Sequence, residues 1–295
     1  MRAAIVIGAA LLLAACTATA GNRAAAPTPS PHASPSAAPT APTSPAADQP
    51  HVFVIVLENR SYSEVVRMSY PAQLASKYGL ATNYHGVAHP SLPNYLALTS
   101  GSTWGISDDG YHDLPAGGLG AQFTAAGIDW RAYMEGMNDG CFNSGYPYAL
   151  KHNPFAYYGG TCPRQVVSFT HFSSDMSGTV PNFVWITPDL CHDGHDCSDA
   201  TVNGWLEQTV PVILDSEAWK HNGVLFITYD EGEDANNSVL TLVIHPRPIL
   251  HRSAQTYNHY SLLATIEDEF RVPRLGQAAH ATPMSGLMAA WPLLA

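Results

Sequence analysis

The chain has 295 residues, of which 46% are hydrophobic and only 13% are charged. It is long enough for one large α/β domain with a tail, or for two small domains, and its composition excludes disorder as the overall description. The formal net charge of −11, with only 13 lysines and arginines, leaves no basic stripe to follow a nucleic-acid backbone, so nucleic acid is not an expected partner. An acidic protein that acts on an anionic substrate needs a local positive charge, and a bound metal ion is the natural source.

The first fifteen residues have the composition of an export signal. A positive residue, Arg2, precedes an apolar stretch at 3–13 that is too short for a comfortable membrane span. The sequence Leu13-Ala14-Ala15-Cys16 resembles a bacterial lipobox, which implies that Cys16 is the lipidated first residue of the mature chain. A plain secretory signal with an unrelated cysteine is the alternative.

A tether is expected to follow the signal. Residues 16–50 are rich in Ala, Pro, Ser and Thr, and they cannot bury enough surface to offset the entropy lost on ordering. We therefore divide the chain into a lipoprotein signal peptide at 1–15, a disordered tether at 16–50 and a folded domain at 51–295. In this interpretation the domain is extracytoplasmic and lipid-anchored to the bacterial cell membrane, with partial release left open.

The folded domain alternates strands with helices. Continuous apolar runs rich in β-branched and aromatic residues predict strands, and these lie at 51–57, 128–133, 182–187, 224–229 and 240–245. Helices are expected up to residue 78 after the first strand, and at 91–101, 201–219 and 261–270. This alternation predicts an α/β fold with a mostly parallel central sheet and helices on both faces.

Four cysteines remain beyond the lipobox, and an even number in an exported protein suggests two disulfides. Three pairings are possible, and proximity in the sequence favours Cys141 with Cys162 and Cys191 with Cys197. A zinc site made from them is less expected, because no Cys-x-x-Cys pair occurs. The first pair falls in 102–162, a stretch that we interpret as loops apart from the strand at 128–133.

Polar residues follow three of the predicted strands directly. Glu58 and Asn59 follow the first strand, the segment 188–197 follows the second, and Asp230 and Glu231 follow the third. Open α/β sheets bind ligands at the carboxyl ends of their strands, and a desolvated carboxylate there needs a partner. Carboxylate and amide oxygens suit a hard or borderline divalent cation, so these residues are candidate metal ligands. The alternative is that they are solvated surface charges.

Ser91 lies between Pro90 and Pro93, on a stiff corner of the kind that displays a nucleophile, although an ordinary turn is the alternative. A metal in contact with Ser91 would favour its attack on a phosphoryl group and give a phosphoserine that water later hydrolyses. Histidines would then hold phosphate oxygens and protonate the leaving oxygen. Their sequence settings favour His195 and His152 for these tasks, with His259 as a weaker third choice.

Five motifs occur in an order that resembles the bacterial and fungal phosphoesterase family. They are Glu58-Asn59-Arg60-Ser61, His89-Pro90-Ser91-x-Pro93-Asn94-Tyr95, Lys151-His152-x-Pro154, the segment 188–196 and Asp230-Glu231. That family contains acid phosphatases and phospholipases C within the alkaline phosphatase superfamily, so the resemblance implies an alkaline phosphatase-like fold over 51–295. In length and spacing the chain is most similar to the mycobacterial secreted acid phosphatases.

The resemblance also implies roles for single residues. Ser91 is the expected nucleophile, and one divalent metal ion would be held by Glu58, Asn59, Ser91, Asp230 and Glu231. The ion is left open among Mg, Ca, Mn, Fe and Zn, and a second ion is in doubt because the Asp/His pair of two-zinc members is Asp/Glu here. His152 and His195 would line the phosphate site. Asn94 is a candidate amide donor to the phosphoryl oxygens, whereas Asp193 and Asp196 match the family's acidic segment without a firm role.

These expectations describe an exported, metal-dependent acid phosphatase that acts on small phosphate monoesters and touches the membrane only through its anchor. A phosphodiesterase of the phospholipase C type is the alternative within the family. A serine carboxylic-ester hydrolase is disfavoured because the Gly-x-Ser-x-Gly elbow is absent around Ser91. A non-catalytic surface lipoprotein is the remaining alternative, and the oligomeric state is left open.

Overall fold

The computed structural model describes residues 49–247 and 252–288. An eight-stranded sheet forms its centre, in the order β5-β4-β6-β1-β7-β8-β2-β9. The strands of this sheet are β1 His51–Leu57, β2 Gly79–Ala81, β4 Trp130–Met134, β5 Val166–Ser168, β6 Phe183–Thr187, β7 Gly223–Tyr229, β8 Thr241–Ile244 and β9 Arg252–Ser253. All neighbouring strands pair in parallel except that β8 is antiparallel to both β7 and β2, which confirms the mostly parallel sheet.

The three central strands form the core because their sequences are apolar on both faces. Residues 52–57 of β1 and the whole of β6 and β7 are buried. Such runs stabilise a sheet only when helices cover both of its faces. β1 therefore lies between β6 and β7, and the carboxyl ends of all three strands meet at one edge of the sheet.

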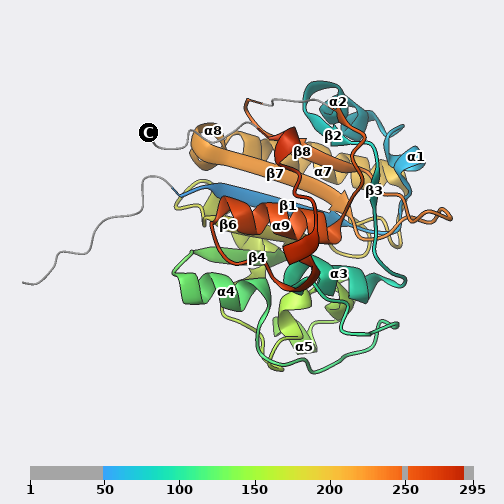
Figure 1. The fold of residues 1–295 in the computed structure, drawn as a ribbon. Helices are drawn as coiled ribbons and strands as arrows, with labels where there is room; N and C mark the ends of the chain where they lie inside the picture. The colour runs from blue at the N-terminus through green and yellow to red at the C-terminus, as the bar shows by residue number, and fades with distance from the viewer. Residues whose placement is uncertain (1–48, 248–251, 289–295) are drawn as a thin grey trace, which may run out of the picture. The chain divides into compact units, whose positions relative to one another are not determined.

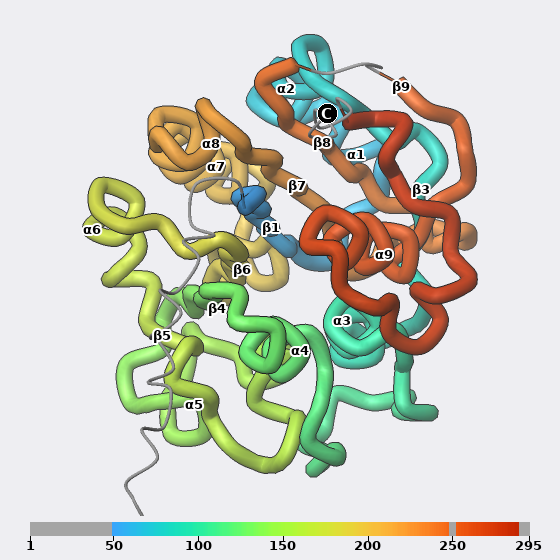
Figure 2. The backbone as a smooth tube through the Cα atoms, turned by 60° about the vertical axis from the view of Figure 1, so that its left-hand side comes forward, coloured from blue at the N-terminus to red at the C-terminus, as the bar shows by residue number. Residues whose placement is uncertain are grey.

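Helices cover both faces, as expected. The longer helices are α2 Ser69–Lys77, α3 Ser91–Ser100, α4 Gly118–Ala126, α7 Asp199–Leu214, α8 Glu217–Asn222 and α9 His259–Glu269. Figure 1 shows α3, α4 and α9 on the near face of the sheet and α7 and α8 behind it. The tube view in Figure 2 shows the same division, with β1 running between the two groups. Every residue of α3 is buried, and Gly101 ends the helix in the left-handed conformation at φ 68°.

Short elements complete the described residues. They are α1 Tyr62–Val65, α5 Gly140–Asn143, α6 Phe172–Met176, a two-stranded sheet of β3 Tyr84–His85 and β10 Tyr257–Asn258, and 3-10 helices at Leu150–His152, Pro154–Ala156, Phe169–His171, Gly276–His280 and Ser285–Leu287. Both expected disulfides, Cys141–Cys162 and Cys191–Cys197, are present. Within the described ranges, no helix has the length and apolar character that a membrane span requires.

The structure corrects three expectations about helices. The single helix expected before residue 79 is two, α1 and α2, which meet at Met68, where the backbone is extended. The helix at 201–219 is likewise divided into α7 and α8. The segment 102–162 is not all loop outside its strand, since it contains α4 and α5. The predicted signal peptide, Cys16 and nearly all of the tether lie outside the described residues.

Candidate active site

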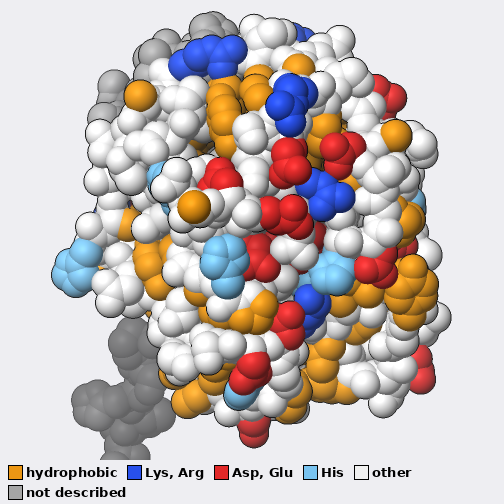
Figure 3. All heavy atoms as spheres, turned by 90° about the vertical axis from the view of Figure 1, so that its right-hand side faces the viewer, with side chains coloured by type: hydrophobic (Ala, Val, Ile, Leu, Met, Phe, Trp, Pro, Cys, Tyr) orange, Lys and Arg blue, Asp and Glu red, His pale blue; other side chains and the backbone are white. Residues whose placement is uncertain are grey.

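Four of the predicted metal ligands, Glu58, Asn59, Asp230 and Glu231, directly follow the carboxyl ends of the neighbouring strands β1 and β7. The two strands are paired along their whole length, and the N–H of Asp230 donates to the carbonyl of Leu57 over 2.9 Å. The N–H of Asn59 in turn donates to Oδ1 of Asp230 over 3.1 Å. Figure 3, which views this end of the sheet, shows acidic side chains gathered at the centre, with histidine and Lys or Arg side chains beside them. Strand pairing therefore places Glu58 and Asp230 next to each other.

Ser91 is the first residue of α3, and its side chain is fully buried against this acidic group. Its Oγ donates a hydrogen bond to Oε2 of Glu58 over 2.9 Å. The N–H of Leu92, next in the helix, donates to Oδ1 of Asp109 over 3.0 Å. A helix N-terminus carries a partial positive charge, which favours an anionic group beside it. The serine hydroxyl is thus held between a carboxylate and an anion-favouring helix end.

Glu58 is the most closely contacted carboxylate of the site. Tyr95, one turn after Ser91 on the same helix, donates its hydroxyl to Oε1 of Glu58 over 2.6 Å. Nε2 of His152 lies 3.2 Å from Oε2 of Glu58, and the His152 ring stacks on the Tyr95 ring. Burial raises the pKa of the Glu58 carboxyl, but the adjacent His152 charge and these hydrogen bonds lower it by more, so the pKa is below its usual value.

His152 is buried between two carboxylates. Its Nδ1 lies 3.1 Å from Oδ2 of Asp193, opposite the contact with Glu58. Burial opposes the charge of this imidazole, but the two carboxylates outweigh burial and raise the pKa of His152 to about 10. Burial also raises the pKa of Asp193, to about 6, against the lowering effect of His152. In this arrangement His152 holds the two acids together.

His195 occupies a more open position than His152. The Cys191–Cys197 disulfide closes the loop that carries it, and the N–H of His195 donates to Oδ1 of Asp193. Nδ1 of His195 lies 2.7 Å from Asp196, whose carboxylate orients the ring. Nε2 lies 3.4 Å from Nζ of Lys151. With about a third of its side chain exposed, His195 can reach a substrate.

Lys151 provides the fixed positive charge of this group. Its Nζ donates to Oδ2 of Asp109 over 2.9 Å, so that Asp109 connects Lys151 with the start of α3. Burial lowers the pKa of this ammonium group, whereas Asp109 and the more distant acids Glu58 and Asp230 raise it. The acids have the larger effect, so the pKa of Lys151 is above its usual value. Lys151 is therefore charged at neutral pH.

The donor set fits a divalent cation. Asp230 is fully buried, and its Oδ2 has no hydrogen-bond partner. Burial raises the pKa of Asp230 well above its usual value, and the neighbouring charges of Glu58 and Glu231 raise it further. Buried carboxylates of this kind are stabilised by pairing with a cation, and oxygen ligands suit a hard or borderline metal. Glu58, Asn59, Ser91, Asp230 and Glu231 are the predicted ligands of such an ion.

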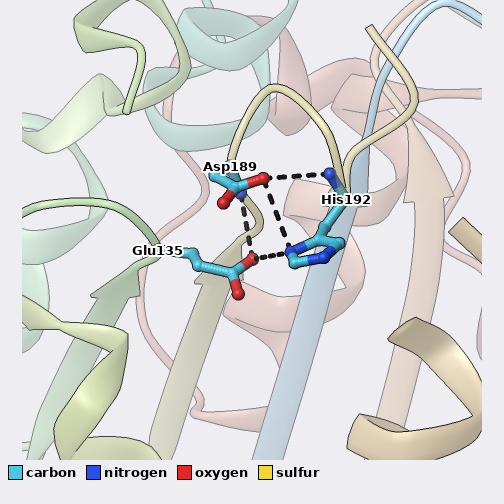
Figure 4. Close-up of side chains that lie close together, drawn as sticks. All are labelled: Glu135, Asp189 and His192. Carbon is cyan, nitrogen blue, oxygen red and sulfur yellow. Dashed lines mark hydrogen bonds and ion pairs between the residues drawn. The ribbon is translucent and has the colours of Figure 1, made fainter. Parts of the chain in front are cut away.

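A second group of potential ligands follows β4 and β6. Glu135, Asp189 and His192 place one ligand atom each within 4.8 Å of one another, as Figure 4 shows. Oε2 of Glu135 accepts from the N–H of Asp189 and contacts Nδ1 of His192, while Oδ1 of Asp189 accepts from the N–H groups of Cys191 and His192. We call this the β4/β6 cluster. Its carboxylates already have donors from the protein.

The family is shown by a comparison with known proteins. The profile of the phosphoesterase family matches residues 65–273, which is more than half of the chain. The chain belongs to the phosphoesterase family. This confirms the expected family. The match begins after Glu58 and Asn59, so their assignment depends on the geometry described above.

Individual relatives are more distant. A phosphate-repressible acid phosphatase of Penicillium chrysogenum is 28% identical over 244 residues, which cover 76% of this chain and 59% of that protein. The chain therefore spans less than two thirds of the length of this fungal relative. A phosphatidylinositol-3-phosphatase of Mycobacterium tuberculosis is 28% identical over 251 residues, with 80% of this chain and 82% of that protein covered.

Solved structures confirm the expected fold class. Murine ectonucleotide pyrophosphatase/phosphodiesterase 5 has a TM-score of 0.57 at 10% identity and covers 77% of this chain and 96% of that one. A protein of the alkaline phosphatase superfamily from Vibrio parahaemolyticus has a TM-score of 0.54 at 13% identity, covering 76% of this chain and 67% of that one. At such identities the likeness concerns the fold alone.

Two sequence-based assignments need correction within this family fold. Both N–H groups of the Asn94 amide donate to backbone carbonyls, those of Ala88 and Pro90, so no N–H remains for a phosphoryl oxygen. Its Oδ1 accepts from the N–H groups of Val87 and Ala88, and Asn94 thus fixes the turn before Ser91. His259 is fully buried, accepts from Tyr84 at Nδ1 and donates from Nε2 to the carbonyl of Asp230. It positions Asp230 and does not face a substrate.

Sequence reasoning missed the contacts of three residues. Tyr95 belongs to the same motif as Ser91. It follows Ser91 by four residues on a helix, a spacing that places both side chains on one face. His89 was identified only as part of a motif, yet its Nδ1 contacts Oε2 of Glu231. Asp109 carried no signal, because it lies in an irregular stretch without periodicity.

Proposed function

We propose that the chain is a metal-dependent phosphomonoesterase of the acid phosphatase type that forms a phosphoserine at Ser91. The observation that carries the proposal is the Ser91 hydroxyl held 2.9 Å from Glu58 at a helix N-terminus, with a buried, unpartnered carboxylate oxygen of Asp230 at the end of the neighbouring strand. Membership of the phosphoesterase family supports the reaction class, and the acid phosphatase relative from Penicillium chrysogenum supports the monoester substrate. The metal's identity stays open.

Ser91 performs the first step in this mechanism. Its hydroxyl proton lies on the hydrogen bond to Oε2 of Glu58, so attack of Oγ on phosphorus transfers that proton toward the carboxylate. The new bond is Oγ to phosphorus, and the bond that breaks joins phosphorus to the ester oxygen. A metal bound to the five oxygen ligands would supply electrostatic stabilisation of the serine alkoxide and of the phosphoryl oxygens.

The leaving oxygen needs a proton, and His195 is the group placed to give it. The ring is oriented by Asp196 and is partly exposed, whereas His152 is enclosed by carboxylates. Lys151, beside His195, adds a positive charge for a phosphoryl oxygen. Water then attacks the phosphoserine, with His195 as base, and releases inorganic phosphate and the free serine.

The test is phosphate release from 4-nitrophenyl phosphate by Ser91→Ala protein. We expect kcat to fall by at least roughly 1,000-fold, because the nucleophile is removed. Ser100→Ala is the matched control, since Ser100 is a buried serine of the same helix whose hydroxyl donates to the backbone of Leu96. Full activity in folded Ser91→Ala protein would refute the mechanism.

A phosphodiesterase of the phospholipase C type is the outcome to be distinguished. Bis(4-nitrophenyl) phosphate reports diester cleavage, whereas 4-nitrophenyl phosphate reports monoester cleavage. The proposal requires a higher kcat/KM for the monoester. Preference for the diester would replace it by the phospholipase C alternative.

We further propose that the domain at 51–295 is exported and anchored through Cys16, with residues 1–15 as signal peptide and 16–50 as tether. The sequence Leu13-Ala14-Ala15-Cys16 supports this proposal. Cys16→Ser is expected to move the protein from the membrane fraction to the soluble extracytoplasmic fraction, as judged by immunoblotting. Unchanged membrane association would contradict the lipid anchor.

A further inference from the structure

Large hydrophobic side chains are exposed in one part of the described chain only. Trp104, Tyr111, Phe142 and Tyr146 are 42%, 47%, 43% and 72% exposed, and all four lie in the segment between α3 and residue 162. Single exposed aromatics are common on soluble proteins, but a group of them marks a contact surface. The question is whether these four lie near the active site.

Tyr111 and Phe142 form a pair. Their ring centres are 5.6 Å apart with the planes nearly perpendicular, an arrangement in which aromatic rings attract each other. Tyr111 also packs on Tyr157, which is almost fully buried, with 5.3 Å between ring centres. The pair therefore has a fixed position, although nearly half of each side chain is open to solvent.

Both members of the pair are connected to the active site. Tyr111 follows Asp109 by two residues, a span of at most about 7 Å, and Asp109 binds both Lys151 and the N–H next to Ser91. Phe142 follows Cys141, whose sulfur accepts from the amide of Asn153, the neighbour of His152. Through Asp109 and Cys141, the pair is thus connected to the residues that adjoin Ser91, Lys151 and His152.

The charges beside the pair limit what it can bind. Asp108 and Asp113 flank Tyr111 within three residues, and Asp139 lies three residues before Phe142. An anionic group would be repelled there, whereas a flat, uncharged ring would gain stacking and lose little hydration. We infer that Tyr111 and Phe142 form a leaving-group subsite for phosphate monoesters whose leaving group is an uncharged aromatic ring, such as a phenol. This inference rests on the proposed phosphomonoesterase function.

The experiment compares kcat/KM for two monoesters, 4-nitrophenyl phosphate and glycerol 2-phosphate. Each variant is compared with wild type on the same substrate, so the different reactivities of the two esters cancel. For Tyr111→Ala and for Phe142→Ala we expect a loss of roughly five- to twentyfold on the aryl ester. On the glycerol ester we expect a change of less than about twofold, because this leaving group has no ring to stack.

Two variants serve as controls. Tyr111→Phe keeps the ring and should retain the wild-type ratio between the two esters. Trp104→Ala removes an aromatic of similar exposure at the other end of α3, where its Nε1 donates to Ser100, about 13.5 Å along the helix from Ser91. It should leave both values unchanged. Circular dichroism and thermal unfolding establish that each variant is folded.

The outcomes separate the inference from the function on which it rests. Equal losses on both esters in the pair variants, or the same aryl-specific loss in Trp104→Ala, would overturn the subsite while wild-type turnover still supported the phosphomonoesterase. A wild-type protein that releases phosphate from neither ester would overturn the proposed function, and the subsite with it.

Discussion

The acids at the carboxyl edge of the sheet fall into two groups, and the hydrogen bonds to their carboxylate oxygens differ. In the group at β1 and β7, Asp230 is fully buried, and its Oδ2 has no hydrogen-bond donor. In the β4/β6 cluster, Asp189 accepts two backbone N–H groups, and Glu135 accepts a third beside His192. Both groups have metal-ligand chemistry, but among the described residues only the first contains a buried carboxylate oxygen without a donor, Oδ2 of Asp230. For this reason we expect the cation at the first group and a structural role for the second, although the ligand atoms of the second lie within 4.8 Å of one another.

The largest expected effect comes from Asp230→Asn. Removing one oxygen ligand and its charge should abolish stoichiometric metal binding, measured by elemental analysis, and lower kcat for 4-nitrophenyl phosphate by at least roughly 100-fold. The metal-free variant should unfold at the same temperature as metal-free wild type or at a higher one, because a buried charge has been removed.

Asp189→Asn is the matched control for that experiment. It makes the same chemical change at the same sheet edge, and the amide oxygen can still accept the two N–H groups that Oδ1 of Asp189 now binds. Metal content and activity should stay near wild type. If Asp189→Asn lost its metal and Asp230→Asn kept it, the roles assigned to the two groups would be reversed.

A buried carboxylate without a donor does not by itself require a metal, and Glu267 is an example outside the site. It lies on α9, its Oε1 accepts from the N–H of Leu275, and its Oε2 has no partner. Burial raises the pKa of Glu267 to about 8. Glu267 can remain protonated in this way, whereas the pKa of Asp230 is raised by burial and also by the neighbouring acids Glu58 and Glu231.

Glu267→Gln should therefore change stability in a pH-dependent manner. Between about pH 4.5 and 8 the unfolded chain loses the Glu267 proton while the folded chain keeps it, so the free energy of unfolding of wild type falls as the pH rises. The variant lacks this loss and should be more stable at pH 8 by up to about 4 kcal/mol, with little difference at pH 4.5. Urea unfolding at both pH values measures the effect. The exposed Glu207→Gln is the control, and a variant less stable than wild type at pH 8 would contradict the argument.

Much of this organisation is predictable from the sequence because it depends on local pattern. Glu58 and Asp230 follow apolar runs that can only be buried strands, and parallel pairing then brings the two acids together. Both disulfides are predictable for a similar reason, since each joins two cysteines that lie near each other in the sequence. Local sequence pattern and proximity in the chain predict a contact correctly when few alternative pairings exist.

Other features depend on tertiary contacts that leave no local pattern. α4 was not predicted, because glycines such as Gly118 and Gly120 disfavour a helix. In the structure the Trp130 ring packs on Gly120, and a Cβ at this position would lie only 2.7 Å from an atom of that ring. Asn94 has the side chain of a phosphate donor, and only the structure shows that the preceding turn uses all of its donors. Asp109 reaches Lys151 across 42 residues of chain.

The smallest expected effect tests the structural role of the β4/β6 cluster. Glu135→Ala removes the acceptor for the N–H of Asp189 and the contact with His192, and it should lower the free energy of unfolding by about 1–2 kcal/mol. Glu135→Gln keeps an acceptor oxygen and should cost less. Neither change should alter the bound metal or kcat, since the protein already supplies donors to this cluster. Metal content is measured together with the unfolding curve. Loss of one metal equivalent in Glu135→Ala would show that the β4/β6 cluster also binds a cation, and the contrast between the two groups would then be wrong.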